Sequence, residues 1–185
     1  MQNQDLRIRK TYAALTQAFQ TLLVQKEFKK ISVNELCELA MIRRPTFYKH
    51  FLDKYDFLNF FIKHKIEEIF SKALVNGDGT PLNFYTIAFE SILDMQAVSE
   101  HFLQNIQINY DLFRELKPVR QFWETLFTNQ VYSPKSSENV LDFSYKSQII
   151  LTLTFDSAIW YFENNNDITR EDMVIKYQSI IRKIL

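Results

Sequence analysis

The chain has 185 residues, with 22 Lys and Arg, 22 Asp and Glu and a formal net charge of zero. This length allows one or two domains. It contains only two glycines and four prolines, which argues against β-sandwiches, barrels and glycine-rich phosphate loops. No apolar run approaches the roughly 18 residues of a membrane span, and the first ten residues lack a signal-peptide pattern. With a single cysteine, Cys37, there is no internal disulfide. We therefore expect a cytoplasmic protein without a membrane partner.

The charge is unevenly distributed along the chain. Residues 1–75 carry 13 Lys and Arg against eight Asp and Glu, whereas residues 76–185 carry nine against 14. Such asymmetry between the halves of a chain indicates a nucleic-acid-binding face on the basic half.

Apolar residues at helical spacing predict two helices in this basic half. The first contains Ile8, Tyr12, Leu15, Phe19 and Leu22 and ends near Glu27. The second runs from about Lys54 to Val75, with Asp53 and Asp56 at its start, where the helix dipole favours negative charge.

Two shorter helices are predicted between them. Ser32 and Glu35 have the spacing of a capping box, in which each side chain binds a backbone N–H group at a helix start. A break follows at residues 41–43, and Pro45 lies in the first turn of the next helix, where its fixed φ is favourable. Residues 32–51 therefore predict a helix-turn-helix.

The second short helix has the side chains of a DNA-reading helix. Phe47 and Phe51 are four residues apart and are expected to point into the core. The residues left facing outward are Arg44, Thr46, Tyr48, Lys49 and His50. They supply hydrogen-bond donors, cations and an aromatic hydroxyl, so we interpret this segment as a recognition helix for double-stranded DNA.

The run PTFYKHF from Pro45 to Phe51, followed by x-Asp-Lys, resembles the TetR family of transcriptional regulators. The resemblance extends from about Ile8 to about Phe60. It implies a dimer that binds a near-palindromic operator and is released by a small molecule. Residues 5–60 would form the DNA-binding domain, with the helix-turn-helix at 32–51, and residues 61–185 the effector-binding and dimerisation domain.

The resemblance also assigns roles to individual positions. Those that match the family's base contacts are Asn34, Arg44, Pro45 and Tyr48. Those that match its phosphate contacts are Ser32, Thr46, Lys49, His50 and Lys54, and Arg43 is taken as a further DNA-contacting residue. The family usually has glycine in the turn, where this chain has Met41. Either the turn differs here, or Met41 tolerates a left-handed backbone at a cost of about 1 kcal/mol or more.

The rest of the chain also predicts helices. Residues 76–81 contain both glycines and predict a turn. Helices are expected at 82–97, 99–108, 110–132, 138–163 and 169–185, the last capped by Thr169 and Asp172. The predicted fold is all-α with about nine helices: a three-helix helix-turn-helix domain joined by a long helix to a helical domain for ligand binding and dimerisation.

The last two predicted helices carry broad apolar faces, and the resemblance implies that they form a homodimer. The expected interface residues are Ile150, Leu153, Ser157, Tyr177, Ile180, Ile181 and Ile184. Packing within one chain produces the same pattern, so that alternative stays open.

The aromatic residues of the middle helices either fill a core or line a cavity for a small apolar or aromatic effector. The candidate ligand-binding residues are Phe89, Phe102, Gln107, Arg120, Trp123, Gln148 and Asp156.

Catalytic and metal-binding patterns are weak. No Gly-x-Ser-x-Gly, phosphate loop or paired carboxylate set is present, so we expect no enzyme, catalytic residue or cofactor. His64, Glu67 and Glu68 have a spacing able to hold a metal, but we interpret them as a solvated helix face and expect no metal site. The leading hypothesis is a dimeric repressor. Its rivals are an activator or partner-recruiting regulator without a small-molecule ligand, and a small helical enzyme that retains the helix-turn-helix as a scaffold.

Overall fold

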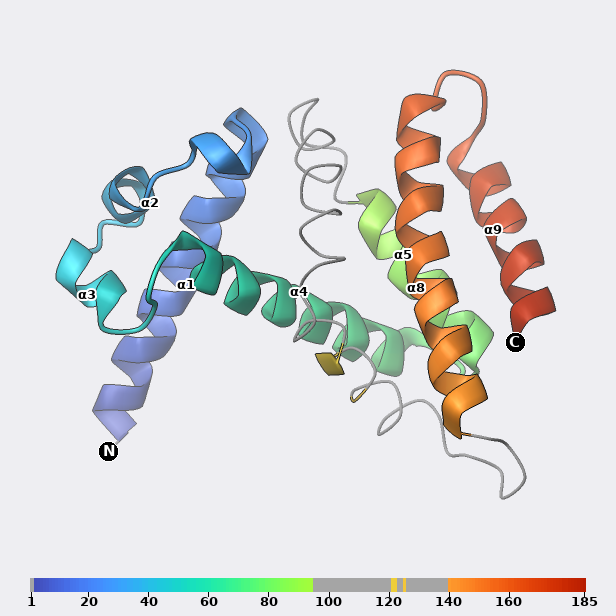
Figure 1. The fold of residues 1–185 in the computed structure, drawn as a ribbon, viewed down its shortest axis with the longest axis horizontal. Coiled ribbons are helices and arrows are strands. Elements are labelled where there is room, and N and C mark those ends of the chain that lie inside the picture. Colours follow the sequence, from blue (N-terminus) through green and yellow to red (C-terminus); the bar gives the residue numbers. More distant parts are fainter. Residues whose placement is uncertain (1, 95–120, 123–124, 126–139) are drawn as a thin grey trace. The chain divides into compact units, whose positions relative to one another are not determined.

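The computed structural model describes residues 2–94, 121, 122, 125 and 140–185, and the regular elements among them are all helical (Figure 1). This confirms the all-α class. The described residues contain seven α-helices against the roughly nine expected. The helices predicted at 99–108 and 110–132 lie outside them, apart from helical residues at 121, 122 and 125. The described chain divides into two compact units, one ending at Ile62 and the other starting at Lys63.

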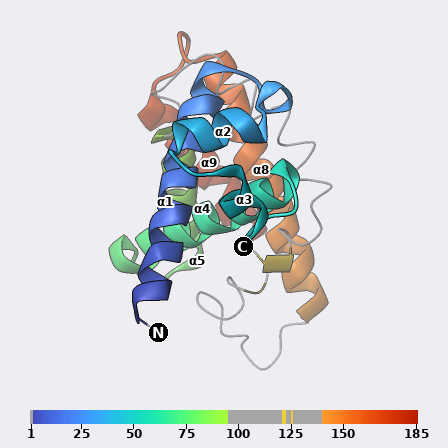
Figure 2. The same ribbon diagram turned by 90° about the vertical axis from the view of Figure 1, so that its left-hand side faces the viewer.

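The first unit contains the predicted helix-turn-helix. Its elements are α1 (Gln2–Gln25), the 3-10 helix η1 (Phe28–Lys30), α2 (Val33–Leu39), α3 (Arg44–Tyr48) and the beginning of α4 (Lys54–Asn76). Helix α2 packs against both α1 and α3. Figure 2 shows α1, α2 and α3 on the side of this unit that faces the viewer.

An aromatic core fixes α3 in this unit. Phe19 of α1, Phe47 of α3 and Phe57 of α4 are completely buried, and Phe51 is 5% exposed. The Phe57 ring lies 5.2 Å from Phe19, 6.0 Å from Phe47 and 4.9 Å from Phe51, measured between ring centroids. Aromatic pairs of this kind contribute about 0.5–1.5 kcal/mol each beyond their area burial. The prediction that Phe47 and Phe51 face the core is confirmed.

Helix α2 begins with the predicted capping box. The Glu35 backbone N–H donates to Ser32 Oγ at 3.2 Å, and the Ser32 backbone N–H donates to Glu35 Oε2 at 3.1 Å. The Glu35 carboxylate also accepts a hydrogen bond from the Lys26 ammonium. The Lys26 contact and the two Ser32 donors lower the pKa of Glu35 to about 2.

Helix α2 ends in a left-handed residue, although that residue is not glycine. Met41 has a φ of 55°. Its N–H donates to the Glu38 carbonyl at 3.1 Å, and the Ile42 N–H donates to the Cys37 carbonyl at 2.9 Å. These two bonds form a Schellman motif, in which the residue after the helix end adopts the left-handed conformation. The second of the two alternatives stated for this turn therefore holds: Met41 adopts the left-handed backbone and tolerates its cost.

The described helices of the second unit are the later part of α4, then α5 (Pro81–Asp94), α8 (Val140–Glu163) and α9 (Arg170–Ile184). Helices α5, α8 and α9 pack against one another. Helix α9 is capped as predicted, because the Asp172 N–H donates to Thr169 Oγ1 at 3.1 Å.

The core of this unit corrects part of the predicted dimer interface. Ile150, Tyr177 and Ile181 are 0% exposed and Ser157 is 8% exposed within the single chain. Their side chains pack against their own protomer, so they cannot form the surface on which a second copy docks. Ile180 is exposed, and Leu153 and Ile184 are half-buried.

Candidate nucleic-acid interface

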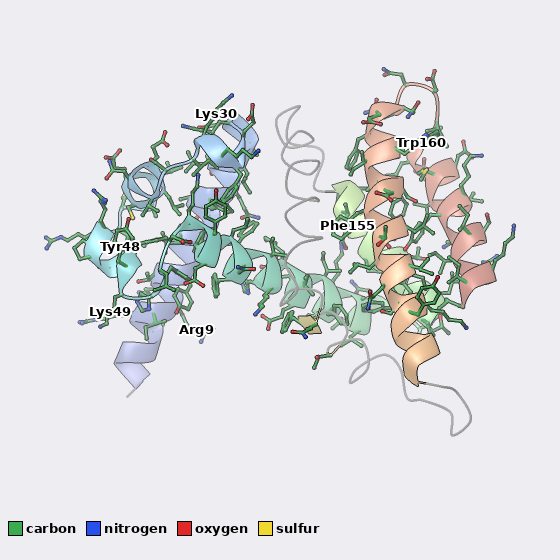
Figure 3. The ribbon with its side chains drawn as sticks, in the orientation of Figure 1. Arg9, Lys30, Tyr48, Lys49, Phe155 and Trp160 are labelled. Atoms are coloured by element: carbon green, nitrogen blue, oxygen red, sulfur yellow. The ribbon has the colours of Figure 1, made fainter. Side chains whose placement is uncertain are left out.

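Helix α3 separates its side chains into an anchoring set and an outward set. Arg43 caps the helix with an extended backbone, and Pro45 occupies its first turn. Phe47 faces inward, whereas Arg43, Arg44, Pro45, Tyr48 and Lys49 are exposed and Thr46 is half-buried. The outward set therefore contains three cations, Arg43, Arg44 and Lys49. Figure 3 labels Tyr48 and Lys49 at α3.

Arg44 and Tyr48 lie one turn apart and contact each other. The Arg44 guanidinium carbon is 5.9 Å from the centroid of the Tyr48 ring, which is a cation–π distance. Both residues remain exposed, Tyr48 to 48%. Stacking limits the side-chain positions of Arg44 without using its N–H donors. A guanidinium held this way is suited to bidentate hydrogen bonding.

His50 lies at the end of the same surface and is held from α1. The Tyr12 hydroxyl lies 3.5 Å from His50 Nδ1, and the two rings meet edge to face with centroids 5.3 Å apart. His50 is half-buried, and its Nε2 has no partner among the described residues. The imidazole can therefore present Nε2 outward while Nδ1 contacts Tyr12.

The two predicted contacts on α2 already have internal partners. Ser32 Oγ donates to Glu35 Oε2 at 3.0 Å, in addition to its role in the capping box. Asn34 is exposed, but its Nδ2 donates to Glu38 Oε1 at 2.9 Å. Ser32 would have to exchange a carboxylate acceptor for a nucleic-acid acceptor, whereas the Asn34 amide has a second N–H donor besides the one bonded to Glu38.

Lys54 is half-buried, and its ammonium is held by backbone groups of its own unit. Its Nζ donates to the backbone carbonyls of Phe28 at 3.3 Å, Lys29 at 2.9 Å and Ile31 at 2.9 Å. An ammonium group has three donors, so all are used. Partial burial lowers the pKa of Lys54 from its ordinary value. All three donors hold the segment that leads into α2, so the phosphate contact predicted from the sequence would have to replace one of these bonds.

The acidic residues near α3 are also engaged internally. Asp53 Oδ1 accepts from the backbone N–H groups of Tyr55 at 2.8 Å and Asp56 at 2.9 Å. Asp56 accepts from the Leu52 N–H at 2.9 Å. These carboxylates cap the start of α4, where the helix dipole also stabilises them.

The candidate effector residues are only partly within the described structure. Phe102, Gln107, Arg120 and Trp123 lie outside the described residues. Phe89 is fully buried and stacks on Tyr177, with centroids 4.1 Å apart and ring planes at 18°. Gln148 is half-buried. Asp156 is exposed, so it does not face the interior of the described helices.

Two pairs of buried hydroxyls were not identified from the sequence. The Thr154 and Tyr177 hydroxyl oxygens are 2.7 Å apart, and the Tyr85 hydroxyl donates to Ser147 Oγ at 3.3 Å. Burial raises the pKa of both tyrosines well above the ordinary value. Helical spacing marks such residues as inward-facing but does not reveal that they pair.

Other kinds of site receive no support from the described residues. Among them, no group of three or more His, Cys, Asp and Glu side chains is arranged to hold a metal, and no helix has the length and apolar character needed to span a membrane. A groove of about 560 Å³ lies between the end of α8 and the start of α9, lined in part by Trp160, Ile168 and Ile175. It contains none of the predicted effector residues.

Solved structures with the same architecture are transcriptional regulators. A TetR transcriptional regulator from Rhodococcus sp. RHA1 aligns over 97% of both chains with a TM-score of 0.70 and 14% identity. The chain has the TetR fold. The dihydroxyacetone kinase operon activator DhaS aligns over 94% of this chain and 93% of its own, with a TM-score of 0.61 and 21% identity. The regulator LfrR from Mycobacterium smegmatis, solved with proflavine, aligns over 97% and 98%, with a TM-score of 0.52 and 13% identity.

The TetR fold is thus found at very low sequence identity. No family model and no curated protein sequence matches the chain. Because one fold can host many functions, the function has to be argued from the surface around α3.

Proposed function

We propose that this protein is a sequence-specific DNA-binding transcriptional regulator, with residues 5–60 as its DNA-binding domain. The observation that carries the proposal is the division of α3, where Phe47 is completely buried while Arg44 and Tyr48 are exposed and in contact. A short helix anchored by aromatic residues and presenting a stacked arginine is suited to the major groove, where arginine binds guanine through two hydrogen bonds.

We further propose that the protein acts as a homodimer on a near-palindromic operator. One recognition helix reads only a few base pairs, whereas two helices one DNA turn apart read a palindrome. The exposed face of α8 supports this proposal. Tyr145, Ile149 and Trp160 are 68%, 37% and 48% exposed, and they lie on one face of the helix together with exposed Thr152 and Asp156.

A repressor released by a small apolar or aromatic molecule is the proposed mode of action, with residues 61–185 as the effector-binding domain. The solved complex of LfrR with proflavine supports this mode. Such a ligand weakens DNA binding by the same factor by which DNA weakens ligand binding, typically about 5- to 150-fold. Thermal-shift screening of apolar and aromatic compounds, followed by operator binding with each stabilising compound, measures this coupling.

An activator is the second candidate, because the structural neighbour DhaS is named an activator. Transcription from a bound promoter, measured with and without the protein, separates the two. Repression and activation change the transcript level in opposite directions.

DNA recognition itself is tested by selecting duplexes from a random library with the full chain and measuring anisotropy on the selected and scrambled duplexes. We expect Arg44→Ala and Tyr48→Ala to reduce the ratio of specific to non-specific affinity, Arg44→Ala by about 1–3 kcal/mol. Lys176→Ala, which removes an exposed cation in the second unit, is the matched control and should leave the ratio unchanged. An unchanged ratio in both α3 variants would show that α3 is not the reading helix.

A further inference from the structure

Helix α1 has an unusual charge pattern in its first half. It contains Arg7, Arg9 and Lys10, and no acidic residue occurs between Asp5 and Glu27. All three cations are exposed, and none has an ion pair or a side-chain hydrogen bond with another described residue. These three cations therefore make no ion pair or side-chain hydrogen bond that would stabilise the described unit.

Tyr12 fixes this part of α1 beside the end of the candidate recognition helix. Its ring lies 5.3 Å from the His50 ring, 5.5 Å from Phe51 and 4.7 Å from Phe60, measured between centroids. Its hydroxyl is 3.5 Å from His50 Nδ1. The position of α1 relative to Lys49 and His50 is thus set by packing within one compact unit.

Arg9 lies one turn before Tyr12 on α1. With about 100° of rotation per residue, Arg9 is about 60° around the helix from Tyr12, whereas Arg7 is about 140° and Lys10 about 160° away. Of the three cations, Arg9 is the one nearest the face that meets His50. Figure 3 shows Arg9 at the same end of the first unit as Lys49.

We propose that Arg9 is a phosphate-contacting residue that extends the DNA interface from α3 onto α1. This inference rests on the proposed DNA-binding function and adds a residue outside the helix-turn-helix. An arginine beside an inserted helix meets the sugar-phosphate backbone next to the bases being read, and its planar guanidinium can bind a phosphate through two hydrogen bonds. Such a contact positions the protein on the duplex and carries no base preference of its own.

The test measures the salt dependence of DNA affinity for the full chain. Each lost phosphate contact reduces the slope of log affinity against log salt by about 0.9. We expect Arg9→Ala to lower this slope by about that amount on both the selected and the scrambled duplex, with an unchanged specificity ratio. Between 50 and 200 mM salt, the fold-decrease in DNA affinity should therefore be about 3.5 times smaller for Arg9→Ala than for the wild type.

Two variants distinguish a contact from general charge. Arg7→Ala removes the same charge from the same helix but from a more distant face, and should change the slope much less. Arg9→Lys keeps the charge and should retain most of the slope. Equal decreases for Arg7→Ala and Arg9→Ala, or no decrease for Arg9→Ala, would overturn the assignment. A thermal melt of each variant confirms that the compared proteins are folded.

Failure of this inference is separable from failure of the proposed function. If the wild-type protein shows no preference for any selected duplex, the proposed function fails, and the inference fails with it. If the wild-type protein binds a selected duplex preferentially while Arg9→Ala keeps the wild-type slope, only the role of Arg9 is wrong.

Discussion

The Lys54 ammonium donates a hydrogen bond to the Ile31 carbonyl at 2.9 Å, and this bond ties the first residue of α4 to the residue immediately before the α2 capping box. Two further bonds, to the Phe28 and Lys29 carbonyls, place the same ammonium at the end of η1. Lysine at this position therefore holds the entry to the helix-turn-helix.

The first prediction concerns Lys54→Met. Removing the ammonium takes one donor from each of three carbonyls, of which only that of Phe28 keeps another among the described residues, the Ile31 N–H, and we expect the unfolding free energy to fall by about 1–3 kcal/mol. The slope of log affinity against log salt should stay at the wild-type value, because no phosphate contact is lost. Thermal or urea unfolding and salt-dependent anisotropy measure the two effects.

Lys49→Ala is the matched control for Lys54→Met. Lys49 is exposed at the end of α3, so its removal should lower the salt slope by about 0.9 and leave stability nearly unchanged. A Lys54→Met protein with wild-type stability and a reduced slope would restore the phosphate contact predicted from the sequence.

The second prediction concerns Met41→Gly. Met41 has a φ of 55° and its side chain is 95% exposed, so the substitution removes backbone strain without removing packing. We expect the unfolding free energy to rise by about 1 kcal/mol. Leu39→Gly, at the last helical residue of α2, is the control and should destabilise the protein. If Met41→Gly does not raise the unfolding free energy, the positive φ of Met41 does not cost the protein stability.

The third prediction concerns the acid stability of the capping box. Because the folded pKa of Glu35 is lowered to about 2 from an ordinary 4.5, the carboxylate stabilises the fold above pH 4.5. That contribution is lost as the pH falls from about 4.5 to about 2. Thermal unfolding of Glu35→Gln should therefore depend less on pH in this window than that of the wild type. Glu67→Gln, on an exposed part of α4, should keep the wild-type pH dependence.

The predictable parts of this fold are those specified by residues close together in the sequence. Ser32 and Glu35 are three residues apart, and Phe47 and Phe51 are four apart, so each pair specifies its own geometry without knowledge of the rest of the chain. The capping box and the inward face of α3 were therefore predicted correctly. Helix η1 was not predicted, because Phe28–Lys30 has no apolar repeat and two of its carbonyls accept from a donor 25 and 26 residues later, in Lys54.

The candidate site was predictable to a similar degree. The outward set on α3 followed from removing the core positions from the helix. The hydrogen bonds of Lys54 could not be predicted, because the sequence is the same whether a lysine after a recognition helix contacts a phosphate or a backbone carbonyl. Ile150, Tyr177 and Ile181 illustrate the same limit in the second unit. An apolar stripe predicts burial, but not whether the partner is the same chain or a second copy.

The last prediction separates those two kinds of burial. Ile149 is 37% exposed on the outer face of α8, whereas Ile181 is 0% exposed in the core of α5, α8 and α9. If the exposed face of α8 forms the proposed homodimer, Ile149→Asp places an unpaired charge in a dry contact between copies and should yield a folded monomer. Light scattering measures the mass, and operator affinity should fall although α3 is untouched.

Ile181→Asp is the contrasting variant. Its charge would lie within the protomer, so it should destabilise the fold itself by several kcal/mol, with loss of helical signal at moderate temperature. Thr152→Asp places the same charge at an exposed polar position on the same face of α8 as Ile149. It tests whether charge alone disrupts association, and should do so less than Ile149→Asp because the side chain it replaces is already polar. A wild-type protein that is monomeric at micromolar concentration, or an Ile149→Asp protein that remains dimeric, would rule out this face of α8 as the dimer interface.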